Sequence, residues 1–140
     1  MIVLDTNVIS AIMRRDPDTH VAAWLDSQPP ESVWTTTVTV FEIRFGLELL
    51  PAGRRRQELE TAFDRALAED FLGRVLKFDQ AAAIEAASIA ARRRLAGQSV
   101  EFRDTQIAGI VLARRAILAT RNVRHFADIA TQVVDPWAAW

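Results

Sequence analysis

The chain has 140 residues, half of them hydrophobic and a quarter charged, and its formal net charge is −1. This composition is typical of one ordinary globular domain, and it excludes wholesale disorder and any general electrostatic case for binding nucleic acid. Cysteine is absent, which excludes disulfide frameworks, thiolate zinc sites and cysteine nucleophiles. No segment reaches the ~20 apolar residues of a membrane span and the N-terminus lacks a basic start, so we expect a soluble, cytoplasmic protein.

Short apolar runs alternate with helical patterns along the chain. Ile2 to Leu4 is apolar and ends at Asp5, as a buried strand would, and Asp5 to Asn7 can cap a helix that reaches Met13. Later strands are predicted from β-branched runs, and later helices from apolar spacing and from Pro or Gly stops. In order these are a helix with Pro17 in its first turn that carries Val21, Trp24 and Leu25, a strand at 33–36, a helix at 39–50, a helix that carries Leu59, Phe63, Leu67 and Phe71, a strand at 75–78, helices at 80–95 and 103–115, and strands at 116–120 and 133–134.

This alternation predicts an α/β fold with a mostly parallel sheet covered by helices on both faces. No repeat, linker or low-complexity segment interrupts it, so we expect a single domain over residues 1–140. Ligands of such folds bind beyond the carboxyl ends of the strands. Asp5 follows the first predicted strand and Asn122 follows the fourth, so candidate functional groups are sought around them.

The positive charge is nearly all arginine, gathered in short clusters. Arginine forks bind phosphate well, but charge runs are most often solvated helix faces. We therefore interpret the clusters as exposed and merely compatible with phosphate binding; they lie at 14–15, 54–56, 92–94 and 114–115.

Glu42 stands where a core residue is expected. Its helical neighbours include Val38, Phe45 and Leu49, which places the carboxylate on or beside the predicted apolar stripe. Gly46, one turn later, costs the helix about 1 kcal/mol relative to alanine and leaves open space beside the carboxylate. The alternative reading is an ordinary solvated helix residue.

Asp104 has a similar position in its helix. Its neighbours Ile107, Ala108 and Val111 are apolar, so the carboxylate faces the predicted buried side. The alternative is an aspartate that stabilises the start of its helix through the helix dipole, just as Asp5 could be a simple helix cap.

Carboxylates that face a core are costly unless they find partners, and three that converge would repel one another. A divalent cation removes this repulsion, and all-oxygen ligands favour Mg²⁺, Mn²⁺ or Ca²⁺ over zinc. The two histidines, His20 and His125, stand alone without the spacing of a zinc pair, and we interpret them as surface or packing residues. Convergence of the carboxylates cannot be inferred from spacing, so a metal site is indicated but its reaction is not.

The ordered set of motifs resembles the PIN-domain ribonucleases, with the closest likeness to the VapC and FitB-like toxins of bacterial toxin–antitoxin pairs. The resemblance spans essentially the whole chain, since each motif occurs in order and at the expected spacing. The segments that carry it are Ile2–Ser10, Thr39–Gly46, Asp104–Ala108, Ala119–Asn122 and the tail Val134–Trp137.

The resemblance implies a three-layer α/β/α sandwich and a metal-dependent endoribonuclease with a catalytic trio of Asp5, Glu42 and Asp104. Asp5 and Asp104 would bind Mg²⁺ or Mn²⁺ directly, and Glu42 would bind through water or position the attacking water. Thr6 would orient Asp5 or a water. Many relatives carry a fourth acid where this chain has Asn122, or a few residues later at His125, so we expect a second metal site to be weaker here.

The resemblance also implies an antitoxin partner, an RNA substrate and a homodimer. An antitoxin tail would insert an arginine or lysine among the carboxylates. The stripe Leu59, Phe63, Leu67 and Phe71 could belong to a dimer interface, although packing onto the chain's own core is its more usual use.

Two rival functions fit the residues less well. A phosphatase with Asp5 as nucleophile would need an acid two residues later, where this chain has Asn7, and a well-placed lysine, although Lys77 is the only one. A receiver-like binding module would need a lysine after the fourth strand, where this chain has Arg121. A degenerate PIN module that only binds would be expected to have lost several acids, and here only the fourth is missing.

Overall fold

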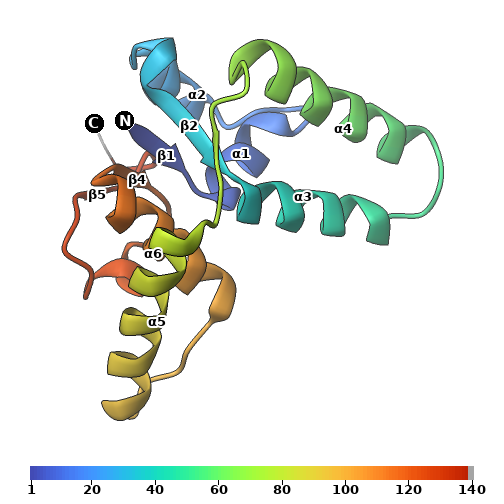
Figure 1. Cartoon of the computed structure of the whole chain (residues 1–140). Helices are drawn as coiled ribbons and strands as arrows, with labels where there is room; N and C mark the ends of the chain where they lie inside the picture. Colours follow the sequence, from blue (N-terminus) through green and yellow to red (C-terminus); the bar gives the residue numbers. More distant parts are fainter. Residues whose placement is uncertain (139–140) are drawn as a thin grey trace.

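A computed structural model, which describes residues 1–138, shows a five-stranded sheet at the centre of the chain (Figure 1). All neighbouring strands are parallel, in the order β3-β2-β1-β4-β5. The strands are β1 (Ile2–Leu4), β2 (Val33–Thr36), β3 (Val75–Leu76), β4 (Ile117–Ala119) and β5 (Val133–Val134). In the central strand, Val3 pairs with Trp34 on one side and with Leu118 on the other. The predicted parallel sheet is confirmed.

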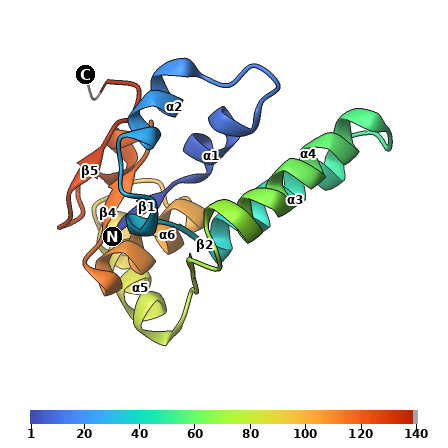
Figure 2. The ribbon, with the colours of Figure 1, turned by 90° about the horizontal axis from the view of Figure 1, so that it is seen from above.

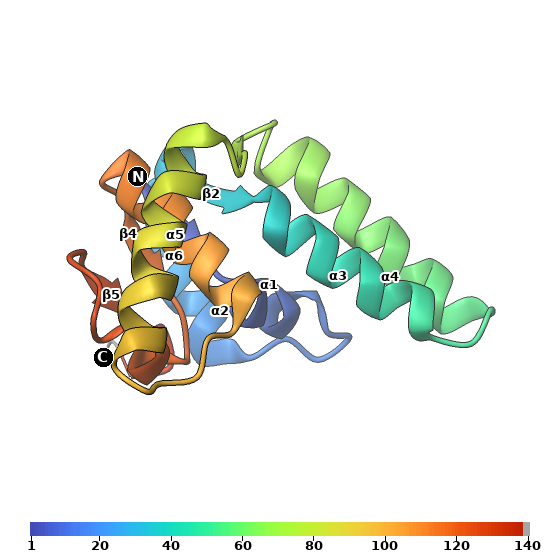
Figure 3. The ribbon, with the colours of Figure 1, turned by 60° about the horizontal axis from the view of Figure 1, so that its bottom comes forward.

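Helices cover both faces of this sheet. They are α1 (Thr6–Met13), α2 (Thr19–Asp26), α3 (Thr37–Leu49), α4 (Arg54–Arg65), α5 (Gln80–Leu95) and α6 (Phe102–Arg114). Figure 2 shows α5 and α6 on one side of the sheet and α1 and α2 on the other, and Figure 3 shows α5 and α6 side by side. Helices α3 and α4 pack mainly with α1 and α2, which gives the three-layer α/β/α arrangement. None of the helices in residues 1–138 is both long and apolar enough to cross a membrane.

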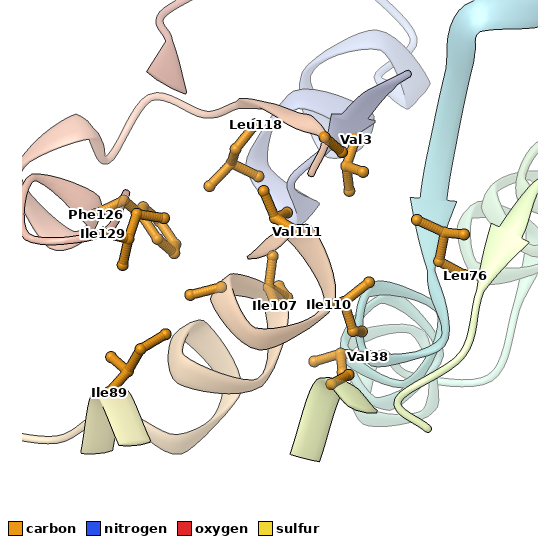
Figure 4. Close-up of a cluster of buried hydrophobic side chains, with 13 residues drawn as sticks. Val3, Val38, Leu76, Ile89, Ile107, Ile110, Val111, Leu118, Phe126 and Ile129 are labelled. Atoms are coloured by element: carbon orange, nitrogen blue, oxygen red, sulfur yellow. The ribbon is translucent and has the colours of Figure 1, made fainter. Parts of the chain in front are cut away.

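The hydrophobic core is split by the sheet into two clusters. Successive side chains of a strand point to opposite faces, so Val3 belongs to one cluster and Leu4 to the other, and Leu118 and Ala119 divide in the same way. Figure 4 shows the cluster beneath α5 and α6, where Phe126 is fully buried. A strand buried on both faces explains why the β1 sequence is continuously apolar rather than alternating.

Helices α3 and α4 form a hairpin that extends away from the sheet (Figures 1 and 2). Phe63 and Phe71 are buried, and Leu59 and Leu67 pack partly buried against the same cluster. The stripe that could have formed a dimer interface therefore packs on the chain's own core, as the alternative reading expected.

Several predicted boundaries differ from the structure by one or two residues, and two of the differences have identifiable reasons. Helix α2 begins after Pro17 rather than around it, because the Asp18 carboxylate accepts hydrogen bonds from the N–H groups of His20 and Val21 and caps the helix there. Strand β3 stops at Leu76, and two residues later the Phe78 N–H is bonded to a threonine hydroxyl instead of a strand.

Helices α5 and α6 approach closely at Gly109, and this contact predicts a stability difference between two glycines. A Cβ at Gly109 would lie 2.4 Å from the Ala82 carbonyl oxygen and 2.7 Å from the Ala86 Cβ, whereas a Cβ at Gly46 of α3 would meet nothing within 4 Å. Gly109→Ala should lower the free energy of unfolding by about 1–2 kcal/mol after its gain in helix propensity, and Gly46→Ala should raise it by up to about 1 kcal/mol. Urea denaturation of both variants checks the opposite signs; equal shifts would contradict the close packing.

Candidate metal centre

Asp5 lies at the carboxyl end of the central strand, between the ends of β1 and β4. Its backbone N–H donates to the Ala119 carbonyl at 2.9 Å, and Asp5 as a whole is 3 % exposed. One carboxylate oxygen accepts the Thr6 N–H at 2.8 Å, which caps α1, and the other accepts the Thr120 hydroxyl at 2.7 Å. The predicted capping role and the predicted site role therefore belong to the same buried carboxylate.

Asn7 and Thr120 tie the two strand ends together. The Asn7 side-chain nitrogen lies 3.4 Å from Asp5 Oδ2 and 3.3 Å from the Thr120 hydroxyl, while its oxygen accepts the Arg121 N–H at 3.2 Å. The Asn122 N–H donates to the same Thr120 hydroxyl at 3.0 Å, but Asn122 itself is exposed. The backbone of Asn122 thus contributes to the Asp5 environment.

Glu42 comes from α3 and faces the start of α1. Its Oε1 accepts the Thr6 hydroxyl at 2.8 Å, and that hydroxyl also lies 3.1 Å from the hydroxyl of Thr39. The Arg103 guanidinium is 3.9 Å from the other Glu42 oxygen. Thr6 therefore links two of the predicted acids, since its N–H holds Asp5 and its hydroxyl holds Glu42.

The apolar stripe predicted around Glu42 is wrong at two of its three residues, and only Val38 is buried. Phe45 and Leu49 are 50 % and 70 % exposed, and the face of α3 that packs inward carries Ile43 and Leu47 instead. Glu42 is half-buried all the same, and it accepts a hydrogen bond from the Thr6 hydroxyl. The open space predicted beside Gly46 is present.

Asp104 lies in the first turn of α6. Its N–H donates to the Glu101 carboxylate at 2.7 Å, so Glu101 is the residue that caps the helix, and the Asp104 side chain is 17 % exposed. Ile107, Ala108 and Val111 are buried as predicted. The ring of His125 meets the carboxylate, with Nδ1 2.9 Å from Asp104 Oδ2.

The three carboxylates influence one another electrostatically. Burial raises the pKa of Asp5 from 3.8 to about 6 against the hydrogen bonds from Thr120 and Thr6, and the charges of Asp104 and Glu42 add to the rise. Burial also raises the pKa of Glu42, and the Asp104 charge contributes in the same direction. The fold therefore brings the predicted trio together at one edge of the sheet.

The donors at this edge suit a hard divalent cation. They are carboxylate and hydroxyl oxygens, and Asp5 is a buried acid with no ion-pair partner among residues 1–138. Within the same residues, no group of three or more His, Cys, Asp or Glu side chains is arranged to hold an ion as it stands. An ion bound here would supply positive charge that offsets the repulsion among the carboxylates.

Comparison with known proteins identifies the fold that carries this site. The family model described as PIN domain matches residues 2–132. This chain belongs to the PIN-domain family. Among curated relatives of this PIN domain, "plasmid stability protein StbB" of Pseudomonas syringae pv. tomato is 41 % identical over 139 residues, which are 99 % of this chain and 100 % of that protein. "VapC ribonuclease Y4jK" of Sinorhizobium fredii is 36 % identical over 98 % of each chain.

A solved structure resembles this PIN domain over nearly its full length. It is described as the structure of FitAB bound to an IR36 DNA fragment, and the matching chain is 35 % identical with a TM-score of 0.88, covering 98 % of this chain and 96 % of that one. The family and the α/β/α fold implied by the sequence motifs are therefore confirmed.

The acidic edge of the PIN domain is the end of the sheet at which Asp5, Glu42 and Asp104 lie. A groove of about 1010 Å³ opens beside it, between α1, α3 and α4. Thr6 and Glu42 line one part of it, together with Gly46. Arginines from two of the predicted clusters, Arg14 and Arg54 among them, line another part. An extended ligand could therefore contact the acidic residues and a basic surface at the same time.

Sequence reasoning missed several residues of the PIN-domain site. Thr120 was quoted within a motif but given no role, although a hydroxyl directly after a strand could have indicated one. His125 was interpreted as a surface or packing residue, yet it contacts Asp104. Arg93 was interpreted as part of a solvated run, yet it is 7 % exposed.

The Thr120 hydroxyl is expected to stabilise the fold mainly when Asp5 is ionised. Thr120→Val keeps the shape of the side chain and removes the donor to Asp5 Oδ2. A hydrogen bond to a charged group is worth about 1.5–3 kcal/mol and one to a neutral group about 1 kcal/mol. Urea denaturation should therefore show a larger loss at pH 8 than at pH 5, because the pKa of Asp5 is about 6. Equal losses at the two pH values would contradict this role.

Proposed function

We propose that this PIN domain is a metal-dependent endoribonuclease and the toxin of a toxin–antitoxin pair. The observation that carries the proposal is the buried Asp5 carboxylate, which has its pKa raised by burial and by the charges of Asp104 and Glu42. A fold that keeps such a costly cluster at its ligand-binding edge is explained by a cation that neutralises it. The relative named a VapC ribonuclease supports RNA as the substrate class.

Asp5 and Asp104 are proposed to bind Mg²⁺ or Mn²⁺ directly, with Glu42 acting through water or holding the attacking water. When bound, the ion would supply Lewis-acid polarisation of the scissile phosphate and a water of lowered pKa. Hard oxygen donors and the absence of cysteine favour these ions over zinc.

The remaining polar residues of the site hold these acids in place. Thr6 restrains Glu42 through its hydroxyl and Asp5 through its N–H, and Thr120 fixes the second oxygen of Asp5. Asn122 is proposed to ligate the ion through its amide oxygen or to hydrogen-bond a water bound to the ion. Because Asn122 adds no charge, a second ion is expected to bind more weakly than in members with four acids, and calorimetry that found two tight sites would overturn this.

We propose an antitoxin as the protein partner and a homodimer as the assembly. The structure of FitAB bound to an IR36 DNA fragment supports a partner for this chain as well. An antitoxin tail that places an arginine or lysine among the carboxylates would compete with the cation for the same negative charge. The stripe of Leu59, Phe63, Leu67 and Phe71 packs on the chain's own core, so the homodimer is expected to use another face.

Cleavage of RNA by the purified protein tests the function. Activity is expected with Mg²⁺ or Mn²⁺, loss of activity with EDTA, and loss in Asp5→Asn and in Asp104→Asn. Asp26→Asn serves as the matched control, because Asp26 is an exposed carboxylate at the end of α2. Undiminished cleavage by either site variant would overturn the mechanism, and a wild type that binds metal and never cleaves RNA would favour a binding-only PIN module.

A further inference from the structure

His125 holds one oxygen of Asp104. The contact joins the turn after β4 to the first turn of α6, with Nδ1 2.9 Å from Asp104 Oδ2. An ionised carboxylate only accepts hydrogen bonds, so the proton of the contact lies on Nδ1. The imidazole therefore favours one orientation of the Asp104 carboxylate.

The backbone of His125 is fixed although its side chain is 58 % exposed. The 3-10 turn Val123–Phe126 carries it, and Phe126 of that turn is fully buried. Arg93 of α5 donates to the His125 carbonyl at 2.7 Å and to both oxygens of Asp128, at 2.9 and 2.7 Å. Phe126 therefore anchors the turn in the core. The buried Arg93 holds it through the His125 carbonyl and through Asp128, two residues after the turn.

The same arginine reaches the helix that carries Asp104. Its third nitrogen lies 3.5 Å from the Thr105 hydroxyl, and that hydroxyl donates to the Glu101 carbonyl at 2.7 Å. Arg93 therefore contacts both segments whose side chains meet at the His125–Asp104 hydrogen bond. Both segments that form the His125–Asp104 contact are therefore held in place by the same buried side chain.

We propose that His125 is a positioning residue that holds Asp104 ready to bind the divalent cation, and that Arg93 fixes His125 in place. The inference rests on the proposed function, because it requires Asp104 to be a metal ligand. Groups that orient a metal ligand commonly change metal affinity 10–100-fold. Since the His125 ring is largely exposed, we expect an effect near the lower limit, about tenfold.

Manganese binding by the full-length protein tests the proposal without RNA. Titration with Mn²⁺, followed by electron paramagnetic resonance, should show a dissociation constant about tenfold higher for His125→Ala than for the wild type. His125→Asn should recover most of the affinity, because the asparagine amide can donate from nearly the position of Nδ1. His20→Ala is the matched control, since His20 is the other histidine and lies in α2, and it should bind Mn²⁺ like the wild type.

Cleavage kinetics and thermal unfolding separate positioning from other roles. Saturating Mn²⁺ should restore most of the kcat of His125→Ala with an unchanged KM for RNA, and the melting temperature should stay within about 2 °C of the wild type. Unchanged Mn²⁺ affinity in His125→Ala would overturn the proposal, as would an asparagine variant as weak as the alanine variant. A wild type that binds Mn²⁺ without cleaving RNA would refute the proposed function while leaving the effect of His125 measurable.

Discussion

Asp5→Asn is expected to lower RNA cleavage by about three orders of magnitude and to make the metal-free protein more stable. A pKa raised from 3.8 to about 6 means that ionised Asp5 destabilises the folded state by about 3 kcal/mol at pH 7. The neutral amide removes this cost but loses about 1 kcal/mol, because it has one oxygen to accept the two hydrogen bonds that Thr6 and Thr120 donate. Urea denaturation in EDTA should therefore show a gain of about 2 kcal/mol.

The gain should depend on pH in a defined direction. Because the pKa of Asp5 is raised on folding, the folded protein binds more protons than the unfolded chain between pH 3.8 and about 6. Ionised Asp5 destabilises the wild type fully above about pH 6, and this destabilisation disappears as the pH falls toward 3.8, the pKa of the unfolded chain. The stability advantage of Asp5→Asn should therefore shrink between about pH 6 and pH 3.8. Mg²⁺ at pH 7 should stabilise the wild type but not Asp5→Asn. A variant less stable than the wild type in EDTA at pH 7 would contradict the argument.

Arg93→Met is expected to lower the free energy of unfolding by about 2–3 kcal/mol. The substitution keeps the aliphatic stem and removes the guanidinium that binds Asp128 and the His125 carbonyl. The loss should fall below the 3–5 kcal/mol typical of breaking a fully buried pair, because the Asp128 side chain is 43 % exposed and can regain water. Chemical denaturation at pH 7 measures the change.

Arg94→Met is the control for this prediction, because Arg94 is the next residue of the same run and is exposed. It should stay within about 0.5 kcal/mol of the wild type. Arg93 also holds the pKa of Asp128 below its usual range, so the contribution of the pair is present at neutral pH and is lost as the pH falls through the folded pKa of Asp128. Equal losses in the two arginine variants would show that burial of Arg93 has no energetic consequence.

The sequence predicted the sheet and most helices because their signals are local. Ile2 to Leu4 and Gln80 to Leu95 carry strong apolar or helix-forming runs with clear stops, and both ranges agree with the structure. Boundaries that depend on a cap, such as the start of α2 at Thr19, were missed because the Asp18 side chain caps the helix and leaves Pro17 before it. Competing caps cannot be ranked without knowing which side chain can turn toward the helix.

The sequence predicted the three acids of the candidate site, but it did not predict the residues that contact them. Asp5 stands at a strand end and Asp104 near a helix start, which are positions that sequence patterns can identify. Thr120 contacts Asp5 across 115 residues and His125 contacts Asp104 across 21, and no local pattern encodes such pairings.

The spacing of residues in α5 could also have indicated that Arg93 is buried. Ala82, Ala86, Ile89 and Arg93 follow one another at steps of four, three and four, and all of them are buried on the face of α5 that packs inward. An arginine in register with such a stripe cannot be a solvated residue unless the helix ends before it. The prediction for residues 92–94 gave all three arginines an exposed position, although Arg93 lies on the buried stripe.

The order of the strands has a consequence for how the protein is made. Asp5 is made 115 residues before Thr120, whose hydroxyl it accepts, and the partner strand β4 directly precedes Thr120. Chains emerge from the N-terminus, so the central strand waits for this neighbour while the residues between them are made. The acidic edge therefore cannot assemble until the segment that carries β4 and Thr120 has left the ribosome.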